Sequence, residues 1–151
     1  MKIAVASDHA GYRLKVVIID YLRQKNHDIL DLGTNDETPV DYPPICAAAA
    51  REVAKGNAQA GIVLGGSGQG EAIAANKVRG IRAALCMDEF TARLARSHND
   101  ANVLSMGGRI VGQGLALAIV EVFFSTPFEG GRHIPRIEQL KDIENQECEN
   151  K

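Results

Sequence analysis

Five short apolar, β-prone runs alternate with longer segments of helical character, and this alternation restricts the fold more than any other feature of the chain. The runs cover residues 2–6, 28–32, 61–64, 81–86 and 102–106. Strands of this kind, most of them followed by a helix, are typical of a parallel sheet that is covered on both faces. We therefore predict one α/β domain over residues 1–151.

Helical spacing is clearest directly after the first run, where Leu14, Val17, Ile18, Tyr21 and Leu22 recur at intervals of three and four. Residues 33–44 are polar and predict a loop, whose last two prolines start the next helix. Leu115, Ile119 and Val122 indicate another helix. The charged segment after Pro127 predicts a C-terminal helix that packs on the domain or on a second subunit.

Composition excludes several classes of protein. The 17 basic and 19 acidic residues nearly balance, so no overall basic field attracts nucleic acid or an anionic membrane. The three cysteines have no CxxC spacing, which favours buried or incidental thiols in a reducing compartment. The N-terminal apolar run is shorter than a signal peptide, and no stretch approaches the roughly 20 residues of a membrane span. We expect a soluble, cytoplasmic protein.

Ligands of open α/β sheets bind beyond the carboxyl ends of the strands. The polar or glycine-rich segments at those positions are residues 7–9, 65–71 and 107–109. The second is the most informative, because a buried strand runs into four glycines and a serine and then into a helix. Such a turn can cradle an anion with backbone N–H groups and a helix N-terminus.

Two nucleotide-binding motifs fail on this loop at one residue. A GxGxxG motif that starts at Gly66 requires glycine at position 71, and a Walker A loop that starts at Gly65 requires lysine there. The chain has Glu71, whose charge would repel a triphosphate. Ordinary nucleotide binding and a purely structural turn stay open as alternatives.

A carboxylate on the rim of an anion cradle suits aldose–ketose interconversion. Glu71 would remove the proton from C2 of an open-chain aldose and return it to C1, while amides around Gly66, Gly68 and Gly70 hold the enediolate oxygen. The helix N-terminus stabilises the ionised form of Glu71, whereas a good base needs a raised pKa. We expect burial beneath bound substrate to raise the pKa.

Two further groups of residues could serve this chemistry. Asp8 with His9, and His98 with Asn99, could supply the acid and base that open a sugar ring, although His98 could simply interact with a helix dipole. The spacing of four between Arg132 and Arg136 predicts that they share one helix face, and with Arg109 they could bind phosphate. A solvated basic face is the alternative.

These residues belong to motifs that resemble the type B ribose-5-phosphate isomerases, within a wider family that includes galactose- and allose-6-phosphate isomerases. The motifs are SDHAGYRLK (7–15), DYP (41–43), GGSGQGEAIAANK (65–77), GIRAAL (80–85), ARSHNDANVL (95–104), GGR (107–109) and EGGRH (129–133). Together they reach across nearly the whole chain except its last dozen residues.

The resemblance implies a Rossmann-like three-layer sandwich with a five-stranded parallel sheet. It also implies a homodimer or a tetramer, with the C-terminal helix packed on the partner subunit and active sites at the subunit boundary. Some arginines would act across that boundary. No metal and no organic cofactor are expected. By position, Asp8 and His98 match the ring-opening pair, Tyr42 and Asn99 match substrate contacts, Ser67 matches a residue that supports the base, and His9, Arg109, Arg132 and Arg136 match the phosphate-binding set.

One position departs from many members of the family. They use a cysteine as the base where this chain has Gly65, so the resemblance assigns the role to Glu71, as the residues themselves do. The predicted reaction is interconversion of ribose 5-phosphate and ribulose 5-phosphate, in the non-oxidative pentose phosphate pathway. Hexose 6-phosphates and a non-catalytic nucleotide-binding module are the alternatives. A cysteine-dependent hydrolase or redox protein is disfavoured, since only Cys86 follows a predicted strand.

Overall fold

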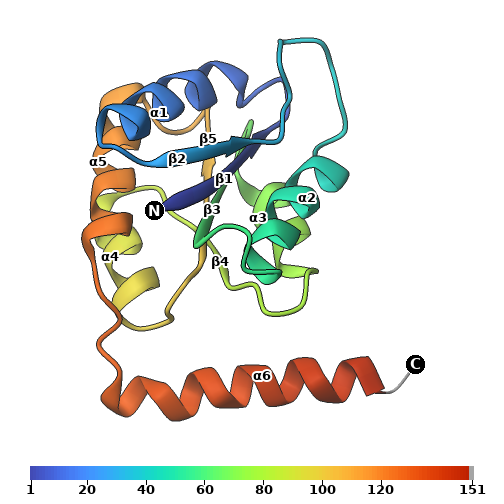
Figure 1. The fold of residues 1–151 in the computed structure, drawn as a ribbon, viewed down its shortest axis with the longest axis vertical. Coiled ribbons are helices and arrows are strands. Elements are labelled where there is room, and N and C mark those ends of the chain that lie inside the picture. The colour runs from blue at the N-terminus through green and yellow to red at the C-terminus, as the bar shows by residue number, and fades with distance from the viewer. Residues whose placement is uncertain (150–151) are drawn as a thin grey trace.

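The computed structural model describes residues 1–149, which fold around one parallel sheet (Figure 1). Its strands are β1 (Lys2–Ser7), β2 (Asp28–Asp31), β3 (Ala60–Gly65), β4 (Ala83–Leu85) and β5 (Val103–Gly107), in the order β2-β1-β3-β5-β4. The predicted five-stranded parallel sheet is confirmed. The order places β1, β3 and β5 side by side at its centre.

Helices cover both faces of the sheet and complete the predicted three layers (Figure 1). One face carries α1 (Tyr12–Gln24), α4 (Glu89–Ser97) and α5 (Gln113–Ser125), and the other carries α2 (Tyr42–Ala54) and α3 (Gln69–Asn76). Alternate residues of each strand supply the two cores. Ile62 and Leu64 belong to the first core and Val63 to the second.

Edge strand β4 is shorter than predicted, because side chains replace strand neighbours around it. The amide of Asn76 accepts from the N–H of Ala83 (2.8 Å) and donates to its carbonyl (2.9 Å). The N–H of Arg82 donates to the Asn102 side chain (2.8 Å), so the segment before Ala83 stays outside the sheet. An edge that is paired in this way is protected against addition of another strand.

The predicted loop over residues 33–44 ends earlier, because α2 begins at Tyr42. Pro43 and Pro44 therefore lie in the first turn of the helix rather than before it. Proline is tolerated there, since the first N–H groups of a helix have no intrahelical acceptor.

The C-terminal segment forms the 3₁₀ turn η1 (Gly131–His133) and helix α6 (Ile134–Glu149). Figure 1 shows α6 extending across one end of the sheet, apart from the three layers. Glu144 accepts from the N–H of Gly80 (2.9 Å), while Leu140 and Ile143 are 47% and 57% exposed. No helix within residues 1–149 has the length and apolar character of a membrane span.

The prediction that Arg132 and Arg136 share one helix face is wrong. Arg132 lies in η1 and precedes the helix that carries Arg136. Gly130 and Gly131 both have positive φ angles (65° and 54°), a conformation that cannot continue a right-handed helix. The glycine pair therefore delays the start of α6.

Candidate active site

The carboxyl ends of β1, β3 and β5 meet at one edge of the sheet, as their parallel arrangement requires. The backbone joins the three segments there: the N–H of Asp8 donates to Leu64 (3.0 Å), that of Gly108 to Gly65 (2.8 Å) and that of Arg109 to Gly66 (3.0 Å). The glycine-rich loop at residues 65–68 thus lies between the other two polar segments.

Glycine is required in this loop because backbone packs directly on backbone. Gly68 has a φ of +80°, and a Cβ at this position would lie 2.8 Å from the carbonyl carbon of Met106. A Cβ on Gly107 would lie 2.4 Å from the carbonyl carbon of Ser67. The loop therefore rests on β5 and turns into α3 within three residues.

Glu71 lies in the first turn of α3 and points into the protein, with only 4% of the residue exposed. Its Oε2 has no hydrogen-bond partner among the described residues. Its Oε1 occupies the space that a side chain on Gly65 would take, because a Cβ there would lie 1.7 Å away. The carboxylate thus fills the position where many family members are expected to carry cysteine.

Burial raises the pKa of the Glu71 carboxyl above its usual range. The backbone N–H groups of Glu71 and Gly68 oppose this shift in pKa, and the charge of Asp8 adds to it. The difficulty posed by the helix N-terminus is therefore resolved in the unbound chain, where burial already outweighs it. The expectation that burial requires bound substrate is wrong, because the missing side chain of Gly65 opens a buried space for the carboxylate.

We expect the Glu71 carboxyl to titrate above the value of about 4.3 that is usual for glutamate. Asp8→Asn should lower this midpoint, because it removes a negative charge that raises the pKa while keeping an oxygen for the backbone. A ¹³C carboxyl NMR titration checks both, with the resonance assigned by its loss in Glu71→Gln. A midpoint that is unchanged in Asp8→Asn contradicts the assignment of the shift to Asp8.

Three other predicted residues surround the loop at this edge. Asp8 is buried, and its Oδ1 accepts from the N–H groups of Ala10 (2.8 Å) and Gly11 (3.0 Å), which favours the ionised form. His9 Nδ1 accepts from the N–H of Val40 (3.2 Å), so its Nε2 carries the proton and can donate to an anion. The ring of Tyr42 lies against Gly70, where a Cβ would be 2.4 Å from Cζ.

A second polar cluster lies at the opposite edge of the sheet. His98 follows α4, and its ring stacks on that of His133 with centroids 4.3 Å apart and planes inclined by 15°. Glu129 Oε2 lies 3.9 Å from Nε2 of His98 and 3.5 Å from Nε2 of His133. Burial lowers the pKa of His133, and the charges of His98 and Arg132 lower this pKa further.

The donor atoms of His98, Glu129 and His133 lie within 4.8 Å of one another. The two rings are nearly parallel and stacked, so the in-plane lone pairs of their nitrogens do not converge on one point. We interpret this cluster as a group that shares charge and hydrogen bonds.

The chain therefore separates the predicted site residues into two sets. The first set, near Glu71, contains Asp8, His9, Tyr42, Gly66, Ser67, Gly68, Gly70 and Arg109, and the second contains His98, Asn99, Arg132 and Arg136. Helix α4 returns antiparallel to the strands, so its nine residues carry His98 about 13 Å back from the edge at which the helix begins. The predicted pairing of Asp8 with His98 does not form within one chain.

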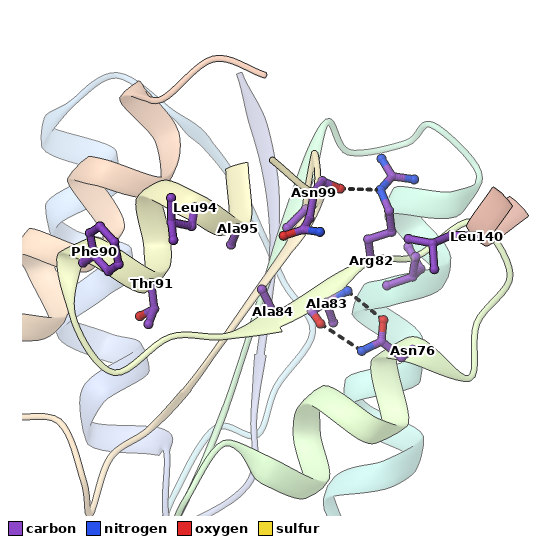
Figure 2. Close-up of a pocket in the computed structure, with 12 residues that line it drawn as sticks. Asn76, Arg82, Ala83, Ala84, Phe90, Thr91, Leu94, Ala95, Asn99 and Leu140 are labelled. Carbon is purple, nitrogen blue, oxygen red and sulfur yellow. Dashed lines mark hydrogen bonds between the residues drawn. The ribbon is translucent and has the colours of Figure 1, made fainter. Parts of the chain in front are cut away.

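The largest described cavity, about 540 Å³, lies along β4 and not at the glycine loop. Figure 2 shows it between the apolar face of α4, with Phe90 and Leu94, and the segment that carries Arg82 and Ala83. Asn99 and Leu140 also line it. Phe90 is 67% exposed, which leaves a broad apolar surface beside the second set of site residues.

Sequence reasoning missed two residues that the structure connects to these sets. Glu129 contacts both histidines of the second cluster, and its N–H donates to Ser97 (3.0 Å). Ser105 lies in the centre of a buried strand, and its hydroxyl donates to the carbonyl of Gly68 (2.7 Å). A polar residue within an apolar strand was the available signal for Ser105. Glu129, in an exposed charged segment, gave none.

A three-layer α/β fold with a buried carboxylate beside an amide-lined loop belongs to a class that is suited to proton transfer on an anionic substrate. The family model for ribose/galactose isomerases matches residues 3–140. The chain therefore belongs to the ribose/galactose isomerase family, which confirms the resemblance seen in its motifs.

Named relatives agree over nearly their whole length. Ribose-5-phosphate isomerase B of Escherichia coli is 43% identical over 143 residues, covering 95% of this chain and 96% of the relative. The enzyme of the same name from Mycobacterium tuberculosis is 46% identical and covers 95% and 90%.

Solved structures show the same fold. Ribose-5-phosphate isomerase B of Clostridium thermocellum matches with a TM-score of 0.96 and 46% identity, over 97% of this chain and 99% of that one. The Mycoplasma genitalium enzyme, solved with bound ribulose-5-phosphate, matches with a TM-score of 0.92 and 41% identity, over 95% and 96%.

Proposed function

We propose that the protein is an aldose–ketose isomerase that interconverts ribose 5-phosphate and ribulose 5-phosphate with Glu71 as its proton carrier. The observation that carries the proposal is the buried Glu71 carboxylate, which has one unpaired oxygen and lies beside the glycine loop. The two relatives and the two structures named above, all ribose-5-phosphate isomerases B, support this choice of substrate.

The reaction moves one proton between neighbouring carbons. Ionised Glu71 takes the proton from C2 of the open-chain aldose, and the C2–H electron pair forms the C1–C2 double bond of an enediolate. Amides of Gly66, Gly68 and Gly70, with Ser67 beside them, hold the oxygen that becomes negative. Glu71 then returns the proton to C1 while the hydroxyl proton leaves O2, and the ketose results. These steps require no metal and no organic cofactor.

The remaining residues open the ring and hold the phosphate. Asp8 and His98 form the ring-opening pair, Tyr42 and Asn99 contact the sugar, and His9, Arg109, Arg132 and Arg136 bind the phosphate. Asp8, ionised by its two backbone N–H donors, fits the role of base in this pair. The proton on His9 Nε2 fits donation to a phosphate oxygen.

This division of labour requires two chains. Residues assigned to one reaction lie at opposite edges of the sheet, so the proposal places the His98 set of one subunit over the Glu71 loop of its partner in a symmetric dimer. The exposed apolar residues of α6 and of the α4 groove support a homodimer in which α6 packs on the partner. Pairing of dimers into a tetramer is compatible with the same contact.

The reaction belongs to the non-oxidative pentose phosphate pathway, and with it we assign the protein to the cytoplasm. The near balance of charge argues against nucleic acid as a partner. A hexose 6-phosphate, allose or galactose 6-phosphate, is the alternative substrate because it shares the same reacting carbons. A nucleotide-binding module is not favoured, since Glu71 replaces the lysine that would hold a triphosphate.

Substrate preference provides the direct test of this assignment. We expect kcat/KM for ribose 5-phosphate to exceed that for allose 6-phosphate and galactose 6-phosphate by more than about tenfold, or some 1.4 kcal/mol of transition-state discrimination. A steady-state assay of the three sugars under identical conditions measures it. A tenfold preference for either hexose phosphate would reassign the substrate, and no turnover of any of them would refute the isomerase.

A further inference from the structure

Ser105 is a fully buried polar residue in the middle of β5, a strand that is otherwise apolar and glycine-terminated. Strand alternation turns its side chain toward the face covered by α2 and α3, the face to which Val103 also contributes. Its hydroxyl donates to the carbonyl of Gly68 at 2.7 Å, across 37 positions of sequence. The proposed chemistry has not yet given this contact a role.

The Gly68 carbonyl lies where the loop becomes a helix. Gly68 is the N-cap of α3, and its carbonyl also accepts the first helical hydrogen bond, from the N–H of Ala72 (3.1 Å). Two donors therefore hold one carbonyl and fix the plane of the peptide between Gly68 and Gln69. In a trans peptide the N–H points opposite to the C=O, so the N–H of Gln69 is directed away from Ser105 and toward the loop.

The Gln69 N–H makes only a long contact there, 3.3 Å to Ser67 Oγ, and so remains able to turn to a stronger acceptor. The loop is otherwise held by backbone bonds from Gly108 and Arg109 and by the close packing of Gly68 and Gly107. Within residues 1–149, Ser105 supplies the one side-chain hydrogen bond that reaches the loop from another strand.

We propose that Ser105 is a positioning residue for the isomerisation, because its hydroxyl orients the Gly68–Gln69 peptide so that the loop amides face the enediolate oxygen. The inference rests on the proposed role of the loop. It adds a requirement that the loop alone does not contain, since the amides stabilise developing charge only when they are oriented before the reaction.

Ser105→Ala tests the proposal, with Ser7→Ala as a matched control. Ser7 is also fully buried at the carboxyl end of a central strand, but its hydroxyl has no partner among the described residues. We expect Ser105→Ala to lower kcat by about tenfold with KM within about twofold, because the orienting bond matters most as charge develops. Ser7→Ala should leave both constants within about twofold.

Amide hydrogen exchange supplies a second measurement. Ser105→Ala should speed exchange at Gln69 and Ala72 but not at the β3 and β5 amides that pair the strands. Wild-type kcat in Ser105→Ala, or an equal loss in Ser7→Ala, would overturn the proposal. If Glu71→Gln keeps the wild-type rate while Ser105→Ala loses it, the assignment of Glu71 fails and that of Ser105 stands. The reverse pattern removes Ser105 alone.

Discussion

Glu71→Gln is expected to lower kcat by roughly 10² to 10⁴, the range that general-base catalysis supplies, while KM and the fold are retained. Glutamine has nearly the same shape as glutamate, so it fits the buried position that the carboxylate occupies beside Gly65. Its amide cannot accept the C2 proton. The loss should therefore appear in the chemical step and not in substrate binding.

Glu89→Gln is the matched control for this change. Glu89 is likewise the acidic residue in the first turn of a helix, but it is exposed and lies in α4. We expect its rate to equal that of the wild type in the same steady-state assay, with circular dichroism confirming that both variants fold. A near-normal kcat for Glu71→Gln would remove Glu71 from the mechanism.

Gly65→Ala should lower kcat by about 10²-fold, although it adds only one methyl group. The new Cβ would lie 1.7 Å from Glu71 Oε1, so the carboxylate must leave its position. The colliding atom is the end of a flexible side chain, and Gly65 lies in a strand without a positive φ. We therefore expect the melting temperature to change little while activity falls.

Gly114→Ala provides the comparison, because a Cβ at Gly114 would meet nothing within 4 Å. Its kcat should match the wild type. Steady-state kinetics and thermal melting of the two variants separate displacement of the base from a general effect of replacing glycine. Full activity in Gly65→Ala would show that the position of the Glu71 carboxylate does not matter.

The sheet and the carboxyl-edge residues were predictable because their signals are local. The buried strand that ends at Gly65 and the glycines that follow it place Glu71 in the first turn of a helix, whatever the rest of the chain does. The burial of Glu71 was not predictable in the same way. It depends on the missing side chain of Gly65 and on the charge of Asp8, which come together only in the folded chain.

The separation of His98 from Asp8 was in principle readable. A helix that joins two parallel strands must run back to their starting edge, so His98, at the end of α4, could not reach the carboxyl edge of its own chain. The start of α6 was harder to predict, because the spacing of Arg132 and Arg136 fits a helix. The backbone of Gly130 and Gly131 overrides that spacing.

Mixed subunits test most directly whether two chains complete one site around Glu71. Glu71→Gln and His98→Ala should each be impaired alone. Co-expressed in equal amounts, random dimers would contain one intact site in every second dimer, so activity should recover to about a quarter of the wild-type value. Activity that stays at the level of the single variants would contradict a shared site and would return Glu71 and His98 to separate roles.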